Sequence, residues 1–326
     1  MKKTMSKTLP WNDIKTPKDD LSVRRIRKCE TLSLYWGKDP QGHCLFIFEL
    51  EDNGLAIFQK NRVSVYGINI DLNVLKPTGN QALVLTLDKH INQDLFYQLC
   101  ETLIQALQSV IEPLTGLSIT LAQIKRWKLF LAGGKERILS LEEIRGLYSE
   151  LIFLQQTIAE TESEYQACDC WQGPEMSHQD FIFSNTAVEV KSLSGRERNT
   201  IRISSEDQLE TVNDNLFINV FRLLEKSGTE YSVSLNELVK NIENTLTDSK
   251  ALELFHHKLA KYGYVELRAY DSPEFIVADE HTYKVEKNFP KLIRSELPAG
   301  MLKVSYEIKL EAIKSYMCHK QDIWNK

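Results

Sequence analysis

The period of the apolar residues changes several times between residues 141 and 223, and this succession restricts the possible folds more than any other feature of the chain. Helical spacing over residues 141–159 gives way to short strand-like runs. These runs cover residues 180–183, 187–190, 200–203 and 216–223. Ser205 and Gln208 have the capping-box spacing with which a helix begins between the last two runs. The order helix, hairpin, strand, helix, strand predicts a mixed α/β core, which we assign to residues 116–230.

The residues before this core predict a β-rich N-terminal domain over residues 1–115. Apolar runs separated by turn sequences predict an antiparallel meander there. The runs cover residues 44–48, 55–58, 63–70 and 82–87. Helical spacing over residues 91–110 predicts an amphipathic helix that covers one face of the sheet.

Residues 231–326 are expected to form a third, C-terminal domain. Ser234 and Glu237 repeat the capping-box spacing of Ser140 and Glu143, so a helix is expected at both places. Two helices (235–246 and 251–261) and three strands (264–268, 274–277 and 282–285) are predicted. Two layouts fit this order: an α/β accessory domain that packs on the core, and a winged-helix-like DNA reader.

The composition excludes several classes of protein. The chain has 326 residues, of which 42% are hydrophobic and 26% charged, as is typical of folded globular proteins. No apolar run approaches the ~20 residues of a membrane helix, and no apolar stretch follows the lysine-rich start as in a signal peptide. We therefore expect a cytoplasmic protein without a membrane partner. The net charge of −5 means that any contact with nucleic acid must come from a local basic patch.

The strongest candidate for chemistry is the tripeptide Glu189-Val190-Lys191. Side chains alternate along a strand, so Glu189 and Lys191 should share one face. Asp180 opens the preceding run, and the polar residues 184–186 suit a turn that would bring the two carboxylates together. Carboxylate oxygens suit Mg²⁺ or Mn²⁺, and a nearby lysine can orient or deprotonate water at a phosphodiester. The alternative is a strand face that is merely exposed to solvent.

Glu150 is a second candidate because it falls on the apolar stripe of the predicted helix, with Leu147 and Leu154. A carboxylate facing the core needs a polar partner, which a metal-bound water or Lys191 would supply. Gly146 should permit close approach of this helix to the sheet. The alternative is a glutamate at the edge of the stripe that reaches solvent.

Several segments resemble, in order, the motifs of a PD-(D/E)XK family found in bacterial restriction and anti-phage gene clusters. The motif segments are Gly146-Leu147-Tyr148-Ser149-Glu150-Leu151, Trp171-Gln172-Gly173-Pro174, His178-Gln179-Asp180-Phe181, Glu189-Val190-Lys191-Ser192 and Ser204-Ser205-Glu206-Asp207-Gln208-Leu209. The tail resembles the family as well, in Ala251-Leu252-Glu253-Leu254-Phe255, Lys261-Tyr262-Gly263-Tyr264 and Ser305-Tyr306-Glu307-Ile308.

The resemblance implies a restriction-endonuclease-like core and a DNA endonuclease that depends on Mg²⁺ or Mn²⁺. It implies that Asp180 and Glu189 are metal ligands and that Lys191 is catalytic. It also implies supporting positions in the site for Glu150 and Gln208.

Some positions in these motifs have a second interpretation. Gln179 stands where the namesake motif has proline; because that proline shapes a turn and touches no metal, we expect its loss to leave the chemistry intact. Gln208 fits a capping box as well as an active site. His178 fits a structural role as well as the placing of a phosphate or a water. Trp171 and Pro174 are expected to pack in the core.

Arg196, Arg198 and Arg202 follow Lys191 closely and give the expected local patch for DNA. The alternative is an ordinary exposed loop.

We find no ATP-binding motif in the sequence. We therefore expect an ATPase or helicase partner, or a DNA-recognition or methyltransferase subunit, from the same defence system. Homodimerisation would let both DNA strands be cut. A different class of function is a catalytically silent DNA-binding or assembly subunit, and a nuclease for RNA or for nicked and branched DNA would use the same residues.

Overall fold

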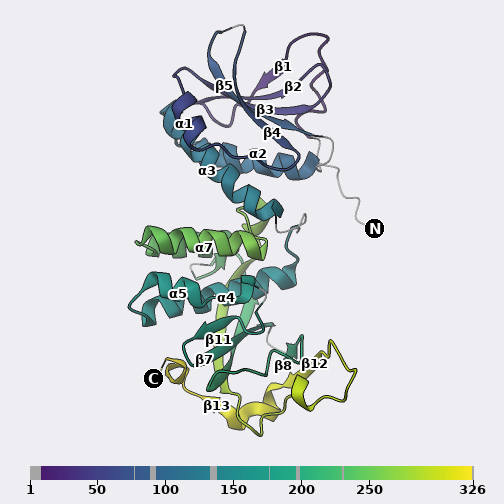
Figure 1. Cartoon of the computed structure of the whole chain (residues 1–326), viewed down its shortest axis with the longest axis vertical. Coiled ribbons are helices and arrows are strands. Elements are labelled where there is room, and N and C mark those ends of the chain that lie inside the picture. Colours follow the sequence, from purple (N-terminus) through teal and green to yellow (C-terminus); the bar gives the residue numbers. More distant parts are fainter. Residues whose placement is uncertain are drawn as a thin grey trace. The chain divides into compact units, whose positions relative to one another are not determined.

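The structure, a computed structural model, describes residues 9–76, 78–88, 93–132, 138–175, 177–195, 199–229 and 231–324, without the side chains of Leu129 and Ala132. The chain divides into an N-terminal unit, residues 1–136, and a C-terminal unit, residues 137–326 (Figure 1). In the described part of the chain, no helix combines the length and the apolarity needed to cross a membrane.

The N-terminal unit contains an antiparallel sheet with the strand order β1-β2-β3-β5-β4. Its strands are β1 (Ser22–Arg25), β2 (Ser33–Lys38), β3 (Cys44–Leu50), β4 (Ile68–Val74) and β5 (Gln81–Leu87). The helices are α1 (Leu55–Lys60), α2 (Gln93–Leu107) and α3 (Pro113–Ala132). The expected helix over 91–110 is confirmed as α2. The strand expected at 55–58 is wrong, since this run forms α1; a run so short does not separate helical from strand periodicity.

The C-terminal unit is built on a mixed sheet with the order β10-β11-β9-β7-β6, and β13 pairs with β11. Its strands are β6 (Phe181–Phe183), β7 (Thr186–Ser194), β9 (Asn215–Glu225), β10 (Val233–Ser234), β11 (Glu274–Lys284) and β13 (Met317–Cys318). β7 and β9 are parallel, whereas β6 and β7 form an antiparallel hairpin. A separate two-stranded sheet joins β8 (Thr200–Ile203) to β12 (Tyr306–Lys309).

The C-terminal unit also contains helices and short turns. The helices are α4 (Leu141–Glu160), α5 (Glu164–Cys170), α6 (Leu235–Thr245) and α7 (Ser249–Tyr262). The short 3-10 turns are η1 (Gly173–Glu175), η2 (Arg268–Tyr270), η3 (Arg294–Glu296), η4 (Leu310–Tyr316) and η5 (Lys320–Ile323). The coarse expectation of a mixed α and β protein with several sheets is confirmed.

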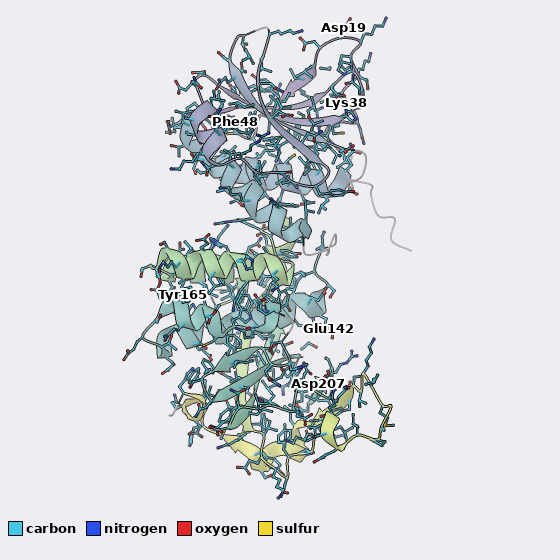
Figure 2. The ribbon with its side chains drawn as sticks, in the orientation of Figure 1. Asp19, Lys38, Phe48, Glu142, Tyr165 and Asp207 are labelled. Carbon is cyan, nitrogen blue, oxygen red and sulfur yellow. The ribbon has the colours of Figure 1, made fainter. Side chains whose placement is uncertain are left out.

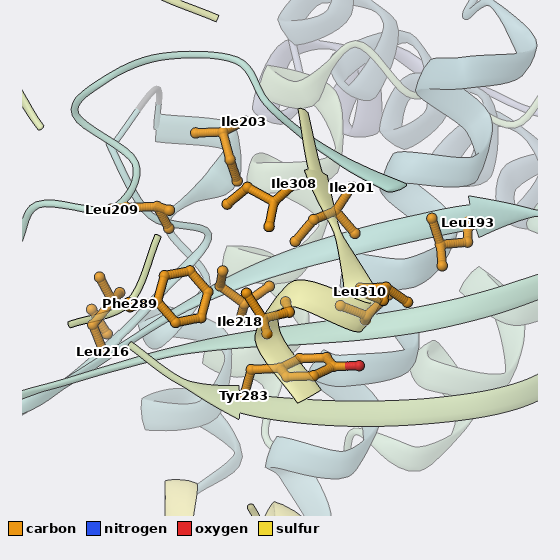
Figure 3. Close-up of a cluster of buried hydrophobic side chains, with 13 residues drawn as sticks. Leu193, Ile201, Ile203, Leu209, Leu216, Ile218, Tyr283, Phe289, Ile308 and Leu310 are labelled. Atoms are coloured by element: carbon orange, nitrogen blue, oxygen red, sulfur yellow. The ribbon is translucent and has the colours of Figure 1, made fainter. Parts of the chain in front are cut away.

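The two faces of the central sheet are covered differently. On one face α4 packs across several strands, with the Phe153 ring 4.7 Å from that of Phe181 and the Tyr148 ring 5.1 Å from that of Phe275. The other face carries an apolar cluster to which β8, β12 and η4 contribute (Figure 3). Its buried members are Ala187, Leu193, Ile201, Ile203, Leu209, Leu216, Ile218, Val220, Tyr283, Phe289, Ile308, Leu310 and Ile313.

The boundaries of the two units differ from those expected for three domains. The expected boundary at 115/116 falls inside α3. The expected boundary at 230/231 separates strands of one sheet, because β11 pairs with β9. The strands expected at 274–277 and 282–285 are one strand with a register shift between Val277 and Asp279. The strand expected at 264–268 is wrong: irregular chain leads there into η2.

Two of the three expected capping boxes are confirmed. The Ser140 and Ser234 side chains accept from the backbone N–H of Glu143 and Glu237, whose carboxylates accept in return from the N-cap N–H. The third expected helix, at Ser205, is wrong, because residues 206–209 form a turn.

Candidate active site

The β6–β7 hairpin brings Asp180 and Glu189 side by side at the edge of the central sheet, just before the start of β6. Phe181 lies opposite Val188, so Asp180, one residue earlier, lies beside Glu189 at the start of the paired region. The backbone N–H of Val190 donates to Asp180 Oδ2 at 2.7 Å. The turn at 184–185 closes the hairpin. The structure therefore has the juxtaposition of carboxylates that the polar residues 184–186 predict.

Glu189 is the most deeply buried carboxylate of the hairpin, with 2% of the residue exposed. Its Oε1 atom accepts from Lys191 Nζ at 2.7 Å and from Gln208 Nε2 at 2.6 Å. Its Oε2 atom is buried without a hydrogen-bond partner among the described residues. A buried carboxylate oxygen left this way is a vacant electron-pair donor for a cation.

Gln208 belongs to this cluster and not to a helix cap. Its Oε1 atom accepts from Lys191 Nζ at 3.2 Å and from the backbone N–H of Ser204 at 2.8 Å. Ser205 Oγ accepts instead from the N–H of Asp207, which closes a turn of a different kind. One amide thus binds the glutamate and the lysine of the tripeptide at once.

Glu150 projects from α4 into the same region and is 7% exposed, so it does not reach solvent at the helix edge. Trp171 Nε1 donates to Glu150 Oε2 at 2.8 Å, and the Tyr262 hydroxyl of α7 also hydrogen-bonds this carboxylate. At Gly173, any Cβ atom would collide with Glu150 Oε2 and lie 3.3 Å from Asp180 Oδ1. Glycine at this position therefore lets the loop pass close to both acids.

Gly146 permits close approach of α4 to α7, whereas close approach of this helix to the sheet was expected. A Cβ atom there would lie 3.3 Å from the Tyr262 hydroxyl, so the small residue makes room for α7 and not for the sheet.

The loop that carries Trp171 is held by its own backbone and by α7. The N–H groups of Gln172 and Gly173 donate to the Asp180 carbonyl at 2.6 and 3.0 Å. Lys258 Nζ, 2% exposed as a residue, donates to the carbonyls of Asp169 and Trp171 at 2.8 and 2.5 Å. Burial lowers the pKa of Lys258. Trp171 is therefore more than a packing residue, since it links α7 to Glu150.

The three carboxyl groups of the site lie in an environment that disfavours their negative charge, so they tend to bind a proton or a cation. Burial, and then the charge of Asp180, raise the pKa of Glu189 to about 8 despite the Lys191 ion pair. Burial and the same neighbour raise the pKa of Glu150 well above its ordinary value. Burial also raises the pKa of Asp180, against the opposing effect of Lys191. One lysine does not offset the desolvation of three carboxyl groups.

A divalent cation fits this donor set. The unpartnered oxygen of Glu189 and the Asp180 carboxylate are hard ligands of the kind that Mg²⁺ and Mn²⁺ take, with water completing the shell. The described residues contain no group of three or more His, Cys, Asp or Glu side chains arranged to hold a metal ion.

The residues expected to contact DNA are only partly described. Arg196 and Arg198 lie outside the described residues. Arg202 is exposed on β8, opposite Glu307 of β12. Arg222 Nη1 donates to the Gly195 carbonyl at 3.0 Å and its Nη2 to Asn199 Oδ1 at 2.9 Å, at the two ends of the segment that follows Lys191. His178 is exposed.

Sequence reasoning missed Gly173, Lys258 and Tyr262. Gly173 and Tyr262 lie in the motif segments, but glycine and tyrosine carry no signal that points to a carboxylate. Lys258 and Tyr262 are one helical turn apart on α7, a spacing that places them on one face but does not say what they face.

Comparison with known proteins gives one match. The model of the family described as "Putative PD-(D/E)XK family member (DUF4420)" matches residues 8–311. No match was found among curated proteins or among solved structures.

Proposed function

Because the chain belongs to this PD-(D/E)XK family, which has a nuclease-like fold, we propose that it is a divalent-metal-dependent deoxyribonuclease that hydrolyses phosphodiester bonds. The observation that carries the proposal is Glu189: one oxygen binds Lys191 and Gln208, and the other is buried and unpartnered beside Asp180. A buried carboxylate oxygen without a partner does not stabilise the fold, but next to a lysine it can bind a metal ion for hydrolysis.

Each side chain of the cluster has a distinct part in the proposed reaction. Asp180 and Glu189 would hold Mg²⁺ or Mn²⁺, which when bound polarises the phosphate and lowers the pKa of water. Lys191 would orient the attacking water and offset the negative charge that develops at phosphorus. Gln208 fixes the Lys191 ammonium next to Glu189 through its 3.2 Å contact. Glu150 would accept a hydrogen bond from a water near Asp180.

Purified full-length protein incubated with plasmid, single-stranded DNA and RNA, each with Mg²⁺ or Mn²⁺, tests the proposal. We expect DNA cleavage that excess chelator and Asp180→Ala both abolish. Cleavage that persists in excess chelator, or in the Asp180→Ala variant, would overturn it. Cleavage of RNA alone would keep the chemistry and change the substrate.

The second candidate is a catalytically silent DNA-binding or assembly subunit. One observation favours it: Lys191 and Gln208 occupy the same oxygen of Glu189, so the cluster is already satisfied there without a metal. Measurement of Mn²⁺ binding separates the two, because a silent subunit would bind no Mn²⁺ at a site that Asp180→Ala removes.

The cellular role is proposed from the resemblance to proteins of restriction and anti-phage gene clusters. The net charge of −5 and the absence of an ATP-binding motif support dependence on a partner ATPase, helicase or DNA-recognition subunit. Homodimerisation would pair two such sites for cleavage of both strands.

A further inference from the structure

Gln179 makes a set of contacts that its place in the sequence does not suggest. Its side-chain Nε2 atom donates to the backbone carbonyls of Asp207, Gln208 and Glu210, at 3.1, 3.2 and 3.0 Å. The residue is 5% exposed. The three carbonyls belong to the turn at 206–209, which presents Gln208 to Glu189 and Lys191, and to the residue that follows it.

Several backbone carbonyls that converge in a buried place need a donor, because an unpaired carbonyl there loses its hydrogen bonds to water. Within the turn, the Asp207 carbonyl accepts a 3.3 Å bond from the N–H of Glu210, and residues 206–209 do not form a helix that would satisfy the other two carbonyls. A primary amide carries two N–H donors on one nitrogen and can be shared among three acceptors, which few other side chains of this size can do.

The same turn is held from its other side by the segment that contains η3. Arg294 Nε and Nη2 donate to Asp207 at 2.7 and 3.0 Å, and the N–H of Val304 donates to Glu206 at 2.8 Å. Figure 2 marks Asp207 on this turn. Gln179 is therefore the contact that ties the turn to the strand of Asp180, whereas Arg294 ties it to the C-terminal segment.

We propose that Gln179 is a positioning residue of the site, one that fixes the Gln208 turn against the start of β6. The inference rests on the proposed function for its catalytic consequence. It reverses the expectation that replacing the motif's proline leaves the chemistry intact: proline has no N–H donor at all, so the namesake residue could not do what Gln179 does here.

The test compares Gln179→Pro, which restores the namesake motif, with Gln179→Met, which keeps the length of the side chain and removes the donors. We expect each to lower metal-dependent cleavage by about 10-fold to 100-fold, as for other residues that orient ligands of a metal. Gln156→Met is the matched control. Gln156 is a half-buried amide of the same unit that donates to Glu280 at 3.0 Å, and its loss should leave cleavage within about 2-fold of wild type.

A double-mutant cycle separates positioning from general damage. If Gln179 acts through Gln208, then Gln179→Met should add less than about 3-fold to the loss caused by Gln208→Ala alone. The inference would be overturned if Gln179→Met lowered cleavage by the same factor in the wild-type protein and in the Gln208→Ala variant. Wild-type cleavage by Gln179→Pro would also overturn it.

Hydrogen exchange of the backbone amides in residues 204–210 gives a readout that does not depend on catalysis. We expect faster exchange in Gln179→Met and unchanged exchange in Gln156→Met, because only the first loses bonds to the turn. Unchanged exchange in Gln179→Met would overturn the positioning role even if cleavage fell. Faster exchange in a protein whose wild type neither cleaves nor binds Mn²⁺ would support the positioning role and refute the proposed function.

Discussion

Lys191 donates to Glu189 and to Gln208 but offers no ligand oxygen, so its loss should separate chemistry from metal binding. We expect Lys191→Ala to abolish cleavage while Mn²⁺ still binds, and Asp180→Ala to remove both. Calorimetric titration with Mn²⁺ and a plasmid cleavage assay check the two properties. Equal loss of both properties in Lys191→Ala would give this lysine a structural role instead.

Glu150 is buried next to Asp180, and replacing it by glutamine keeps its shape and removes its charge. We expect Glu150→Gln to lower cleavage by about 10-fold to 100-fold. The melting temperature of the metal-free variant should rise at neutral pH, because a buried carboxyl near Asp180 must either stay ionised without water or take up a proton, and an amide does neither. Glu142→Gln, exposed on the same helix, is the control and should cleave like wild type. A Glu150→Gln variant with full activity would remove Glu150 from the site.

The raised pKa of Glu189 predicts how stability depends on pH in the absence of metal. The folded protein holds a proton on Glu189 up to about pH 8, whereas the unfolded chain loses it near the ordinary value of 4.5. The folded state therefore binds more protons in this range, and the free energy of unfolding falls as pH rises from about 4.5 to about 8.

For one such group the slope is at most about 1.4 kcal/mol per pH unit. Urea unfolding in the presence of chelator at several pH values measures it. Glu189→Gln should show a shallower fall than wild type. Equal slopes in the two proteins would mean that the pKa of Glu189 is not raised in this way.

At the scale of elements, α7 holds the loop that carries Trp171, and Lys258 of α7 donates two hydrogen bonds to it. Lys258→Met should leave the Trp171 carbonyl without its donor, whereas the Asp169 carbonyl keeps the 2.6 Å bond from Gln172 Nε2. We expect a total cost of about 1–3 kcal/mol. Urea unfolding measures the total.

Lys240→Met provides the comparison on a neighbouring helix. Lys240 forms a 2.7 Å ion pair with Glu266 but its side chain is 49% exposed, so its loss should change stability by no more than about 1 kcal/mol. Similar stability losses in the two variants would show that Lys258 does not brace the loop.

At the scale of the whole molecule, every described residue of the candidate site lies in the C-terminal unit. The segment 137–326 has its own sheet and its own apolar cluster. We expect this segment, expressed alone, to unfold cooperatively and to bind Mn²⁺ at the site that Asp180→Ala removes. Circular dichroism and Mn²⁺ titration check this. A segment that fails to fold would show that the N-terminal unit contributes to the core.

The proposed dependence on a partner is also a property of the whole molecule. With a net charge of −5, the isolated chain should bind DNA weakly and cut plasmid slowly. Cleavage rates with and without candidate ATPase or recognition subunits measure the effect. Efficient site-specific cleavage of both strands by the chain alone would contradict it.

The sequence by itself determined the features that depend on neighbouring residues. Alternation along residues 187–191 placed Glu189 and Lys191 on one face, and the polar turn at 184–185 closed the hairpin with Asp180. The capping boxes at Ser140 and Ser234 fixed two helix starts. Each of these features depends on residues that lie only a few positions apart in the sequence. The periodicity and spacing of the residues are therefore enough to predict them.

Only the tertiary structure decided the contacts between distant segments. Gln208 fitted a helix cap equally well until the sheet supplied Glu189 and Lys191 as partners. Gln179 was expected to be a neutral departure, and Lys258 gave no sign of its contact with Trp171, 87 residues away in sequence. Which donor meets which buried acceptor depends on how whole elements pack, and no local pattern specifies that.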